Sequence, residues 1–262
     1  MIRLSPQHLP AVSRWFDTGA PGSAALAEHV AATGVGAWWG DRALSPRTVA
    51  VSCAGHVLLS GDPGTLSPAL LAPFAHSRVE APDRFLPLLD AAFDRVVPAE
   101  RLVYVYREPV AAPRPPRGVT VRRLEPGDAP ALAALSPASA WIHSSWGGPQ
   151  GLAASGHGWA AFDRSGRVAT VACGYFVGNT YERLAVLTPT EHRNERLALA
   201  CVASLCADIG ARGRVASWSF GRGDRIGRLL AWTAGFRLEH EYARHITGGA
   251  AAQPRTPPRV SA

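Results

Sequence analysis

The chain has 262 residues, of which 47% are hydrophobic and 18% charged. This length provides one large domain or two modest ones with a substantial core, and the balance is typical of a globular protein. The N-terminus lacks the apolar segment of a signal peptide, and no apolar run reaches the ~20 residues of a transmembrane helix. We therefore expect a soluble cytoplasmic protein with no membrane partner.

The charge is unevenly distributed along the chain. The net charge is +7, and the sequence contains arginine but no lysine. Residues 1–112 contain 9 arginines against 10 acidic residues, whereas residues 113–262 contain 18 against 10. The positive surplus is thus confined to the second half. It favours a polyanionic partner, which could be a nucleotide cofactor, an acidic carrier protein or RNA.

The cysteines show no metal-ligand spacing. None belongs to a CxxC pair, and all lie in apolar stretches: Cys53, Cys173, Cys201 and Cys206. Because free cysteine behaves as a small hydrophobic residue, we expect buried thiols and no bound metal.

The first part of the chain is predicted to form a small unit of helices and strands over residues 1–110. Helical patterns alternate with a hairpin over 49–59, which turns at Ala54-Gly55, and with a strand over 102–106. No motif in this unit identifies a chemical function. The proline-rich segment that follows, 111–117, predicts an extended linker.

The second unit is predicted to span residues 118–247, followed by a disordered Gly/Ala/Pro/Arg-rich tail at 248–262. Three consecutive antiparallel strands end in the strand 181–187. A polar turn and an amphipathic helix follow, then a strand at 214–220 and a helix that stops at Gly235. In such a β-α-β-α unit, the turn before the first helix exposes backbone N–H groups that can bind phosphate or another anion.

This order of elements resembles the GNAT superfamily of N-acyltransferases over about residues 118–246. The residues that carry the resemblance are Thr-Pro-Thr-Glu-His-Arg-Asn-Glu-Arg-Leu-Ala at 188–198, Trp218, Leu230-Ala231, Gly235-Phe236 and the segment 141–156. The resemblance implies an α/β (α+β) fold in which helices flank a mixed sheet. The preceding smaller domain would be an accessory unit or a degenerate GNAT-like unit.

The resemblance also implies a donor site for acetyl-CoA or another acyl-CoA. Family members hold the coenzyme A pyrophosphate on an Arg/Gln-x-x-Gly-x-Gly/Ala turn. Arg193 and Ala198 match this turn, but Arg196 occupies the central glycine position. That arginine either blocks the close approach of phosphate to the backbone or binds the anion itself. The implied donor-binding residues are Val186, Leu187, Thr188, Arg193, Asn194, Glu195, Arg196, Leu197 and Ala198.

Amide formation requires a neutral amine, and hence a base or a proton relay. Glu182 is one candidate, because partial desolvation would raise its pKa. An ion pair between Glu182 and Arg183 is the alternative interpretation. His143 is the second candidate because imidazole titrates near neutrality, although a structural role is common for such a histidine. The residues beside His143 that we predict to contact substrate are Trp141, Ser145 and Trp146.

The leading prediction is an N-acyltransferase that moves an acyl group from acyl-CoA directly to the amine of a small molecule. The altered turn and the arginine surplus favour an alternative donor, which is an acyl carrier protein or an aminoacyl-tRNA. A non-catalytic module that kept the fold and lost the donor site is a further alternative. Arg196, Gly227 and Ala231 favour it, since many family members have a tyrosine general acid at the position of Ala231.

Overall fold

The computed structural model describes residues 1–9, 11–22, 24–193 and 196–251. Over these ranges the strands form one sheet, in the order β1-β2-β3-β4-β5-β12-β6-β11-β10-β9-β8-β7. The strands are β1 (Ile2–Arg3), β2 (Ala37–Gly40), β3 (Thr48–Cys53), β4 (His56–Gly61), β5 (Arg78–Glu80), β6 (Val96–Tyr106), β7 (Thr120–Arg123), β8 (Gly158–Phe162), β9 (Val168–Val177), β10 (Tyr181–Leu187), β11 (Val215–Gly221) and β12 (Phe236–Thr247).

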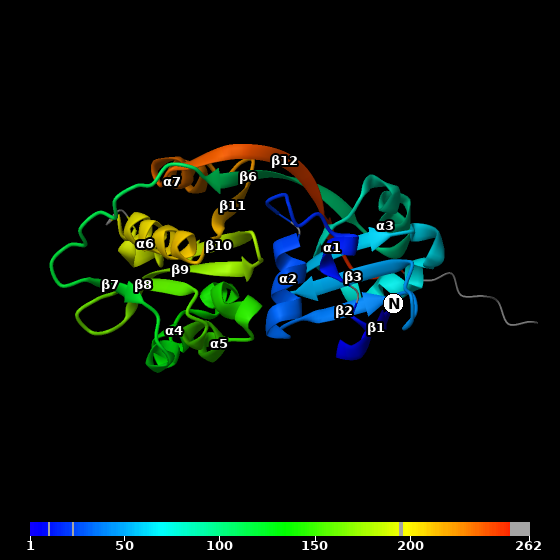
Figure 1. The fold of residues 1–262 in the computed structure, drawn as a ribbon, viewed down its shortest axis with the longest axis horizontal. Helices are drawn as coiled ribbons and strands as arrows, with labels where there is room; N and C mark the ends of the chain where they lie inside the picture. Colours follow the sequence, from blue (N-terminus) through cyan, green and yellow to red (C-terminus); the bar gives the residue numbers. More distant parts are fainter. Residues whose placement is uncertain (10, 23, 194–195, 252–262) are drawn as a thin grey trace, which may run out of the picture.

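Helices cover this sheet on both faces (Figure 1). The α-helices are α1 (Val12–Trp15), α2 (Ala24–Thr33), α3 (Leu86–Ala92), α4 (Ala129–Ala133), α5 (Pro149–Ala154), α6 (Leu197–Ala211) and α7 (Arg225–Thr233). Short 3₁₀ helices are η1 (Pro6–His8), η2 (Pro63–Thr65), η3 (Pro68–Phe74), η4 (Asp83–Phe85), η5 (Pro126–Asp128), η6 (Pro137–Trp146) and η7 (Thr190–His192). Among the described residues, none of the helices is long and apolar enough to cross a membrane.

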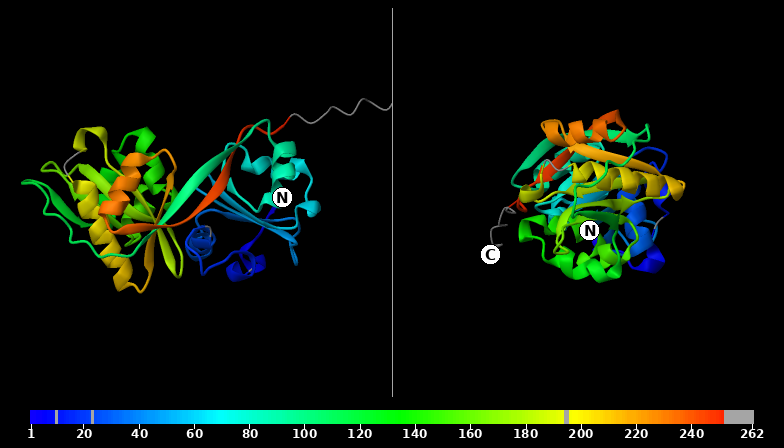
Figure 2. Two further views of the ribbon diagram at one scale, coloured as in Figure 1. Left: turned by 90° about the horizontal axis from the view of Figure 1, so that it is seen from above. Right: turned by 90° about the vertical axis from the view of Figure 1, so that its left-hand side faces the viewer.

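Two long strands join the halves of the molecule. β6 and β12 run side by side from one half to the other (Figures 1 and 2). β6 also pairs with β11, and β12 also pairs with β5. β6, which belongs to the predicted first unit, therefore lies between β12 and β11 of the predicted second unit. The sheet continues without a break across the whole molecule.

The hydrophobic pattern explains how the second half is layered. β9 is buried along nearly its whole length, as expected for a strand covered on both faces. On one face, α6 buries Leu197, Cys201 and Leu205 at a spacing of four residues against Trp218 and other residues of the sheet. On the other face, α4, α5 and η6 pack in a core that also includes α2 and β4 of the first half. This shared core ties the two halves together.

Buried polar bonds fix α2 against the turn between β9 and β10. Both carboxylate oxygens of Glu28 accept hydrogen bonds from Asn179, one from its backbone N–H and one from its side-chain amide, each 2.9 Å long. The next residue, His29, accepts from the backbone N–H of Val177 and donates through Nε2 to the carbonyl of Ser145 at 2.8 Å. Losing such a buried partner costs about 1–3 kcal/mol. The first half is therefore a specific support for the β9–β10 turn.

Several predicted elements are confirmed. The hairpin over 49–59 is β3–β4, and β8, β9 and β10 are consecutive antiparallel strands. β10 and β11 are parallel, as the β-α-β reading required. The cysteines are free and buried. Of the predicted tail, residues 252–262 lie outside the described residues. Nearer its start, Ala250 forms a β-bridge with Phe93, and Ala251 donates to the carbonyl of Ala92 at 2.9 Å.

Candidate active site

A cleft of about 1120 Å³ opens where β10 and β11 separate. Residues Tyr181 to Arg183 of β10 pair with β11, and the described residues of β10 after Arg183 do not. The residues that follow on each strand line the cleft instead: Leu184, Ala185 and Val186 from β10, and Trp218, Ser219 and Phe220 from β11. The cleft therefore exposes strand backbone that an extended ligand could pair with.

The start of α6 forms one end of this cleft. Arg196 is the N-terminal capping residue, and its side chain makes no capping hydrogen bond. The first intrahelical hydrogen bond runs from Ala200 N–H to Arg196 O, so the N–H groups of Leu197 and Ala198 precede it. Both residues line the cleft. Unbonded N–H groups at a helix start, with the positive end of the helix dipole, form an anion site.

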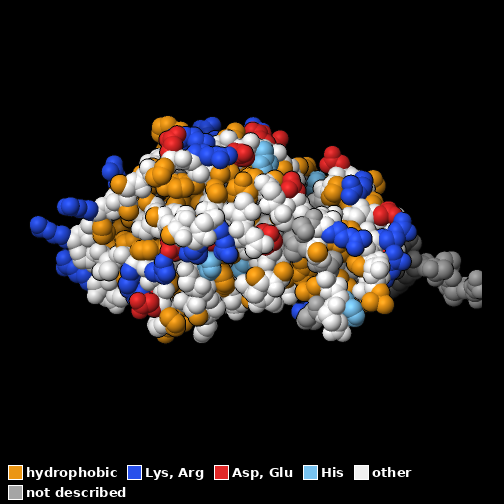
Figure 3. Space-filling view, viewed as in Figure 1, with side chains coloured by type: hydrophobic (Ala, Val, Ile, Leu, Met, Phe, Trp, Pro, Cys, Tyr) orange, Lys and Arg blue, Asp and Glu red, His pale blue; other side chains and the backbone are white. Residues whose placement is uncertain are grey.

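The side of the cleft formed by α7 is apolar. Ile226 and Leu229 line it and are 85% and 65% exposed. In Figure 3, hydrophobic side chains gather over α7. Exposed apolar side chains beside a cleft commonly mark a ligand or protein contact. This apolar rim and the start of α6 line the same cleft, so a ligand with both a charged and an apolar part fits the two surfaces.

Six of the predicted donor-binding residues line the cleft: Val186, Thr188, Arg193, Arg196, Leu197 and Ala198. Leu187 lines a separate pocket of about 390 Å³ on the side of α4 and η6. Asn194 and Glu195 lie outside the described residues. Arg196 adopts a left-handed backbone conformation with φ +57°. This conformation is easier for glycine than for arginine, because the Cβ of an L-residue is crowded in it.

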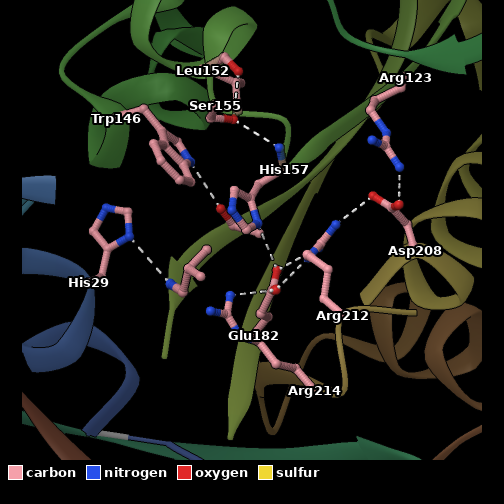
Figure 4. Close-up of polar contacts among 12 residues, drawn as sticks. His29, Arg123, Trp146, Leu152, Ser155, His157, Glu182, Asp208, Arg212 and Arg214 are labelled. Atoms are coloured by element: carbon pink, nitrogen blue, oxygen red, sulfur yellow. Dashed lines mark hydrogen bonds and ion pairs between the residues drawn. The ribbon is translucent and has the colours of Figure 1, made fainter. Parts of the chain in front are cut away.

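Glu182 is fully buried at the start of β10 and does not line the cleft. Its carboxylate accepts hydrogen bonds from His157 Nδ1 at 3.1 Å, from Arg212 at 3.0 and 3.1 Å, and from Arg214 at 3.1 Å. Gly174, on the neighbouring strand β9, leaves room for the carboxylate, because a Cβ there would lie 2.9 Å from Oε2. The network continues from Arg212 to Asp208 (Figure 4).

The predicted pKa of Glu182 is wrong in direction. Burial alone would raise the pKa, but hydrogen bonds from His157 and Arg212 outweigh burial and lower it to about 2. The carboxylate therefore stays ionised and has no free oxygen for an incoming proton. Glu182 does not form the predicted ion pair with Arg183. The guanidinium of Arg183 lies 3.9 Å from the carboxylate of Glu80 instead. We accordingly assign Glu182 to an ion-pair network rather than to proton transfer.

The residues predicted around His143 divide between the cleft and the core. Trp141 lines the cleft. His143 is half-buried outside the lining, and burial lowers its pKa. Ser145 is fully buried. The indole of Trp146 donates to the carbonyl of Gly174 at 2.9 Å, so its ring is part of the packing. Of the three predicted substrate contacts, Trp141 lines the cleft, whereas Ser145 and Trp146 do not.

Comparison with known proteins places the chain in a family. A family model described as GNAT acetyltransferase matches residues 110–244. An uncharacterized N-acetyltransferase encoded in the mutA 5′ region of Streptomyces virginiae is 75% identical over 212 residues, which is 81% of this chain and 90% of that protein. The chain belongs to the GNAT acetyltransferase family. It is accordingly an N-acetyltransferase enzyme, and the predicted family resemblance is confirmed.

Solved structures of GNAT proteins share the fold. A GCN5-related N-acetyltransferase-like protein from Streptococcus suis superposes with a TM-score of 0.67 at 16% identity, covering 88% of this chain and 95% of the other. A tandem GNAT protein from the clavulanic acid biosynthesis pathway superposes at 0.54 with 12% identity, covering 87% of each chain. At this identity the likeness shows the fold alone. It confirms the predicted mixed sheet with flanking helices.

Sequence reasoning missed the part of the GNAT cleft that comes from the first half. Ala54, His56, Arg78 and Arg101 line it, although we found no functional motif there. The sequence offered little signal, because the β6–β12 pairing brings these residues to the site across long stretches of chain. Tyr175 also lines the cleft and was missed. It lies at a β-bulge opposite Arg183 and Leu184, which the strand pattern alone does not reveal.

Proposed function

We propose that this GNAT enzyme transfers the acetyl group of acetyl-CoA directly to the amine of a small molecule. The observation that carries the proposal is the continuity of one cleft from the start of α6 to the gap between β10 and β11. In this arrangement the donor phosphates bind the N–H groups of Leu197 and Ala198 and the guanidinium groups of Arg193 and Arg196. The acyl end then lies beside the separated strands.

The edge of β10 suits the amide-containing arm of coenzyme A. Residues Leu184 to Val186 do not pair with β11, so the main-chain groups on the β11 side of this segment are open to the cleft. An arm that carries amide groups pairs with such an edge as an added strand would. The apolar rim of Ile226 and Leu229 gives further contact surface. These features support an acyl-CoA over a donor that lacks such an arm.

The state of the thiols supports direct transfer. Burial raises the pKa of Cys173 and Cys201 to about 12 each, and it raises that of Cys53 to about 11. A thiol nucleophile reacts as its thiolate, so these cysteines are inert at neutral pH. In the proposed step the amine nitrogen attacks the thioester carbonyl carbon. The C–N bond forms, the C–S bond breaks, the sulfur takes up a proton and the amine loses one.

In this proposal the hydroxyl of Tyr175 donates the proton that the leaving sulfur takes up. This hydroxyl lies 2.9 Å from that of Ser144, which in turn donates to the carbonyl of Trp141 at 2.7 Å. Burial raises the pKa of Tyr175, against the opposing effect of the Ser144 bond, so the phenol is protonated at neutral pH. Ala231, at the position of the usual family tyrosine, is fully buried in the core below α7. Tyr175 is thus the phenol that faces the cleft.

Two measurements test the proposal. Calorimetric titration should show acetyl-CoA binding, and a thiol-release assay over a panel of amines should show amine-dependent turnover. Tyr175→Phe should lower kcat about 100-fold with little change in acetyl-CoA affinity, since a general acid contributes about 10²–10⁴-fold. Tyr181→Phe, at the far end of β10, is the matched control. If acetyl-CoA does not bind while an acyl carrier protein or an aminoacyl-tRNA serves as donor, the proposed donor is wrong.

A further inference from the structure

Strand register gathers basic side chains on one face of the sheet where the two halves meet. Across β12 and β5, Ile246 pairs with Arg78, and across β5 and β4, Arg78 pairs with His56. Across β12 and β6, Tyr242 pairs with Arg101. Directly paired residues share a face, as do alternate residues of one strand. The members of this group that line the cleft, which we call the arginine face, are His56, Arg78, Arg101 and Arg244.

The arginine face lies across the sheet from the donor end of the cleft. Arg101 pairs with Gly221, so it shares a face with Ser219, and it donates to the carbonyl of Ser219 at 2.6 Å. Trp218 points to the other face, where α6 packs. The gap between β10 and β11 connects the two sides. A donor bound at the start of α6 and a second substrate on the arginine face therefore meet at the gap.

Polar atoms on this face are buried without partners in the structure. His56 is 8% exposed, and its Nδ1 has no hydrogen-bond partner. The Nε of Arg244 is also buried with no partner. Buried polar groups in folded proteins are nearly always hydrogen-bonded, so each exception needs an explanation. A ligand that accepts hydrogen bonds would supply the missing partners.

The charge on this face is positive, because several arginines surround the carboxylate of Glu80. The nearby carboxylate, Glu80, already accepts from Tyr242 at 2.9 Å and lies 3.9 Å from Arg183. Burial, and then repulsion from Arg101, lower the pKa of Arg244 to about 10. Burial and the surrounding arginines lower the pKa of His56 well below its usual value, so its imidazole is neutral and can donate one hydrogen bond. These groups all favour an anion.

We propose that Arg78, Arg101 and Arg244 bind a carboxylate or phosphate group of the acceptor, and that the enzyme therefore selects amines that carry an anionic group. This inference rests on the proposed function, because it places the amine acceptor opposite an acyl-CoA. Guanidinium groups match the planar, two-oxygen geometry of carboxylates and phosphates. Neutral His56 adds a donor. The anion is held on the arginine face while the amine end reaches the gap between β10 and β11.

A kinetic comparison of matched amines tests the selection. β-Alanine is compared with β-alaninamide, and 2-aminoethyl phosphate with ethanolamine, which also separates carboxylate from phosphate recognition. The anionic member of at least one pair should have a kcat/KM 10-fold higher or more. Arg244→Gln should remove that preference by lowering kcat/KM for the anionic member of the pair. Arg114→Gln, on the exposed linker, is the matched control. Equal use of both members by the wild type would overturn the inference.

A binding measurement decides the question without turnover. Inorganic phosphate and acetate are titrated while the melting temperature is followed, since a ligand of the folded state raises it. At least one anion should stabilise the wild type and the Arg196→Gly variant but not Arg244→Gln. If the stabilisation is lost in Arg196→Gly and kept in Arg244→Gln, the anion binds at α6 and the inference is wrong.

Acetyl-CoA calorimetry on the same variants separates the two proposals. Arg244→Gln should bind acetyl-CoA within about 2-fold of the wild type, because the arginine face holds the acceptor. A 10-fold loss would mean that the arginines bind the donor, and that would overturn the inference. A wild type that fails to bind acetyl-CoA, yet is stabilised by anions through Arg244, would refute the proposed donor and retain the anion site.

Discussion

Two groups of arginines lie on opposite faces of the sheet around β10, and they differ in their partners. On the α6 face, Arg212 and Arg214 both bond to the buried carboxylate of Glu182. On the other face, Arg101 donates to Ser219 and lies near the carboxylate of Glu80, and the buried Nε of Arg244 has no partner among the described residues. The same residue type is therefore neutralised within the fold in one place and left with unmatched charge at a cleft in the other.

This difference separates a structural role from a binding role. Removing one partner of a buried, hydrogen-bonded ion pair strongly destabilises the fold, because the other partner is left as an uncompensated buried charge. A buried cation without a carboxylate lowers the stability of the folded chain. Such a group is consistent with a ligand that brings the opposite charge. Burial alone would not distinguish the two groups, whereas the bonding partners do.

The largest expected effect is on the paired group. Glu182→Gln keeps the shape of the side chain but removes the charge that Arg212 and Arg214 share. Breaking a buried ion pair costs about 3–5 kcal/mol, and the amide retains part of the hydrogen bonding, so we expect a loss of about 3 kcal/mol. Urea unfolding followed by tryptophan fluorescence measures it. Glu191→Gln, at an exposed position, should change stability by less than about 0.5 kcal/mol. Equal effects of the two substitutions would contradict the assignment.

The same carboxylate should make stability depend on acid pH. Its pKa is about 2 in the folded chain, whereas the ordinary value for this side chain is 4.5. A lowered pKa stabilises the folded state above pH 4.5, and that contribution is lost as the pH falls from about 4.5 to 2. The difference corresponds to at most about 3 kcal/mol. Unfolding free energies measured across this window should fall more steeply for the wild type than for Glu182→Gln. Parallel curves would rule out a lowered pKa.

Paired and unpaired arginines should respond to substitution with opposite signs. Arg212→Gln removes one of the two arginines bonded to Glu182, and the loss of a charged hydrogen-bond partner costs about 1–3 kcal/mol. Arg244→Gln removes a partly buried cation that is repelled by Arg101, so the variant without ligand should be as stable as the wild type or more so. Thermal unfolding of both variants under one buffer measures the signs. Destabilisation by both would show that Arg244 has a structural partner in solution.

Local sequence patterns predicted much of the second half. The sequence indicated a strand at 181–187 and an amphipathic helix after it, and these are β10 and α6. Both signals act over a few residues, and tertiary packing agrees with them. The start of α6 was also predictable, because a turn between a strand and a helix exposes N–H groups whatever surrounds it.

The other side of the site depends on long-range pairing that local patterns do not contain. Arg78, Arg101 and Arg244 meet only because β5, β12 and β6 are neighbours in the sheet. The environment of Glu182 was mispredicted for the same reason. Its partners Arg212 and Arg214 come from beyond α6, and a buried carboxylate has a raised or lowered pKa according to such partners.

Arg196→Gly has the smallest expected effect on stability and the sharpest bearing on the donor. A left-handed conformation costs an L-residue about 1–2 kcal/mol, and glycine avoids this cost while losing more entropy on folding, so the variant should be about 0.5–1 kcal/mol more stable. Because Arg196 lines the cleft beside open N–H groups, we expect it to bind donor phosphate. Acetyl-CoA affinity should then fall about 10-fold, and the loss should shrink as salt is raised.

The two effects of Arg196→Gly have opposite signs, which makes the outcome easy to read. Thermal unfolding gives the gain in stability, and calorimetry gives the loss in affinity at low and high salt. Arg193→Gln is the matched variant, since it removes a neighbouring charge at a position without the backbone strain. A rise in acetyl-CoA affinity for Arg196→Gly would mean that the side chain obstructs the site. A fall in acetyl-CoA affinity together with a gain in stability would show that Arg196 strains the backbone and that its charge strengthens donor binding.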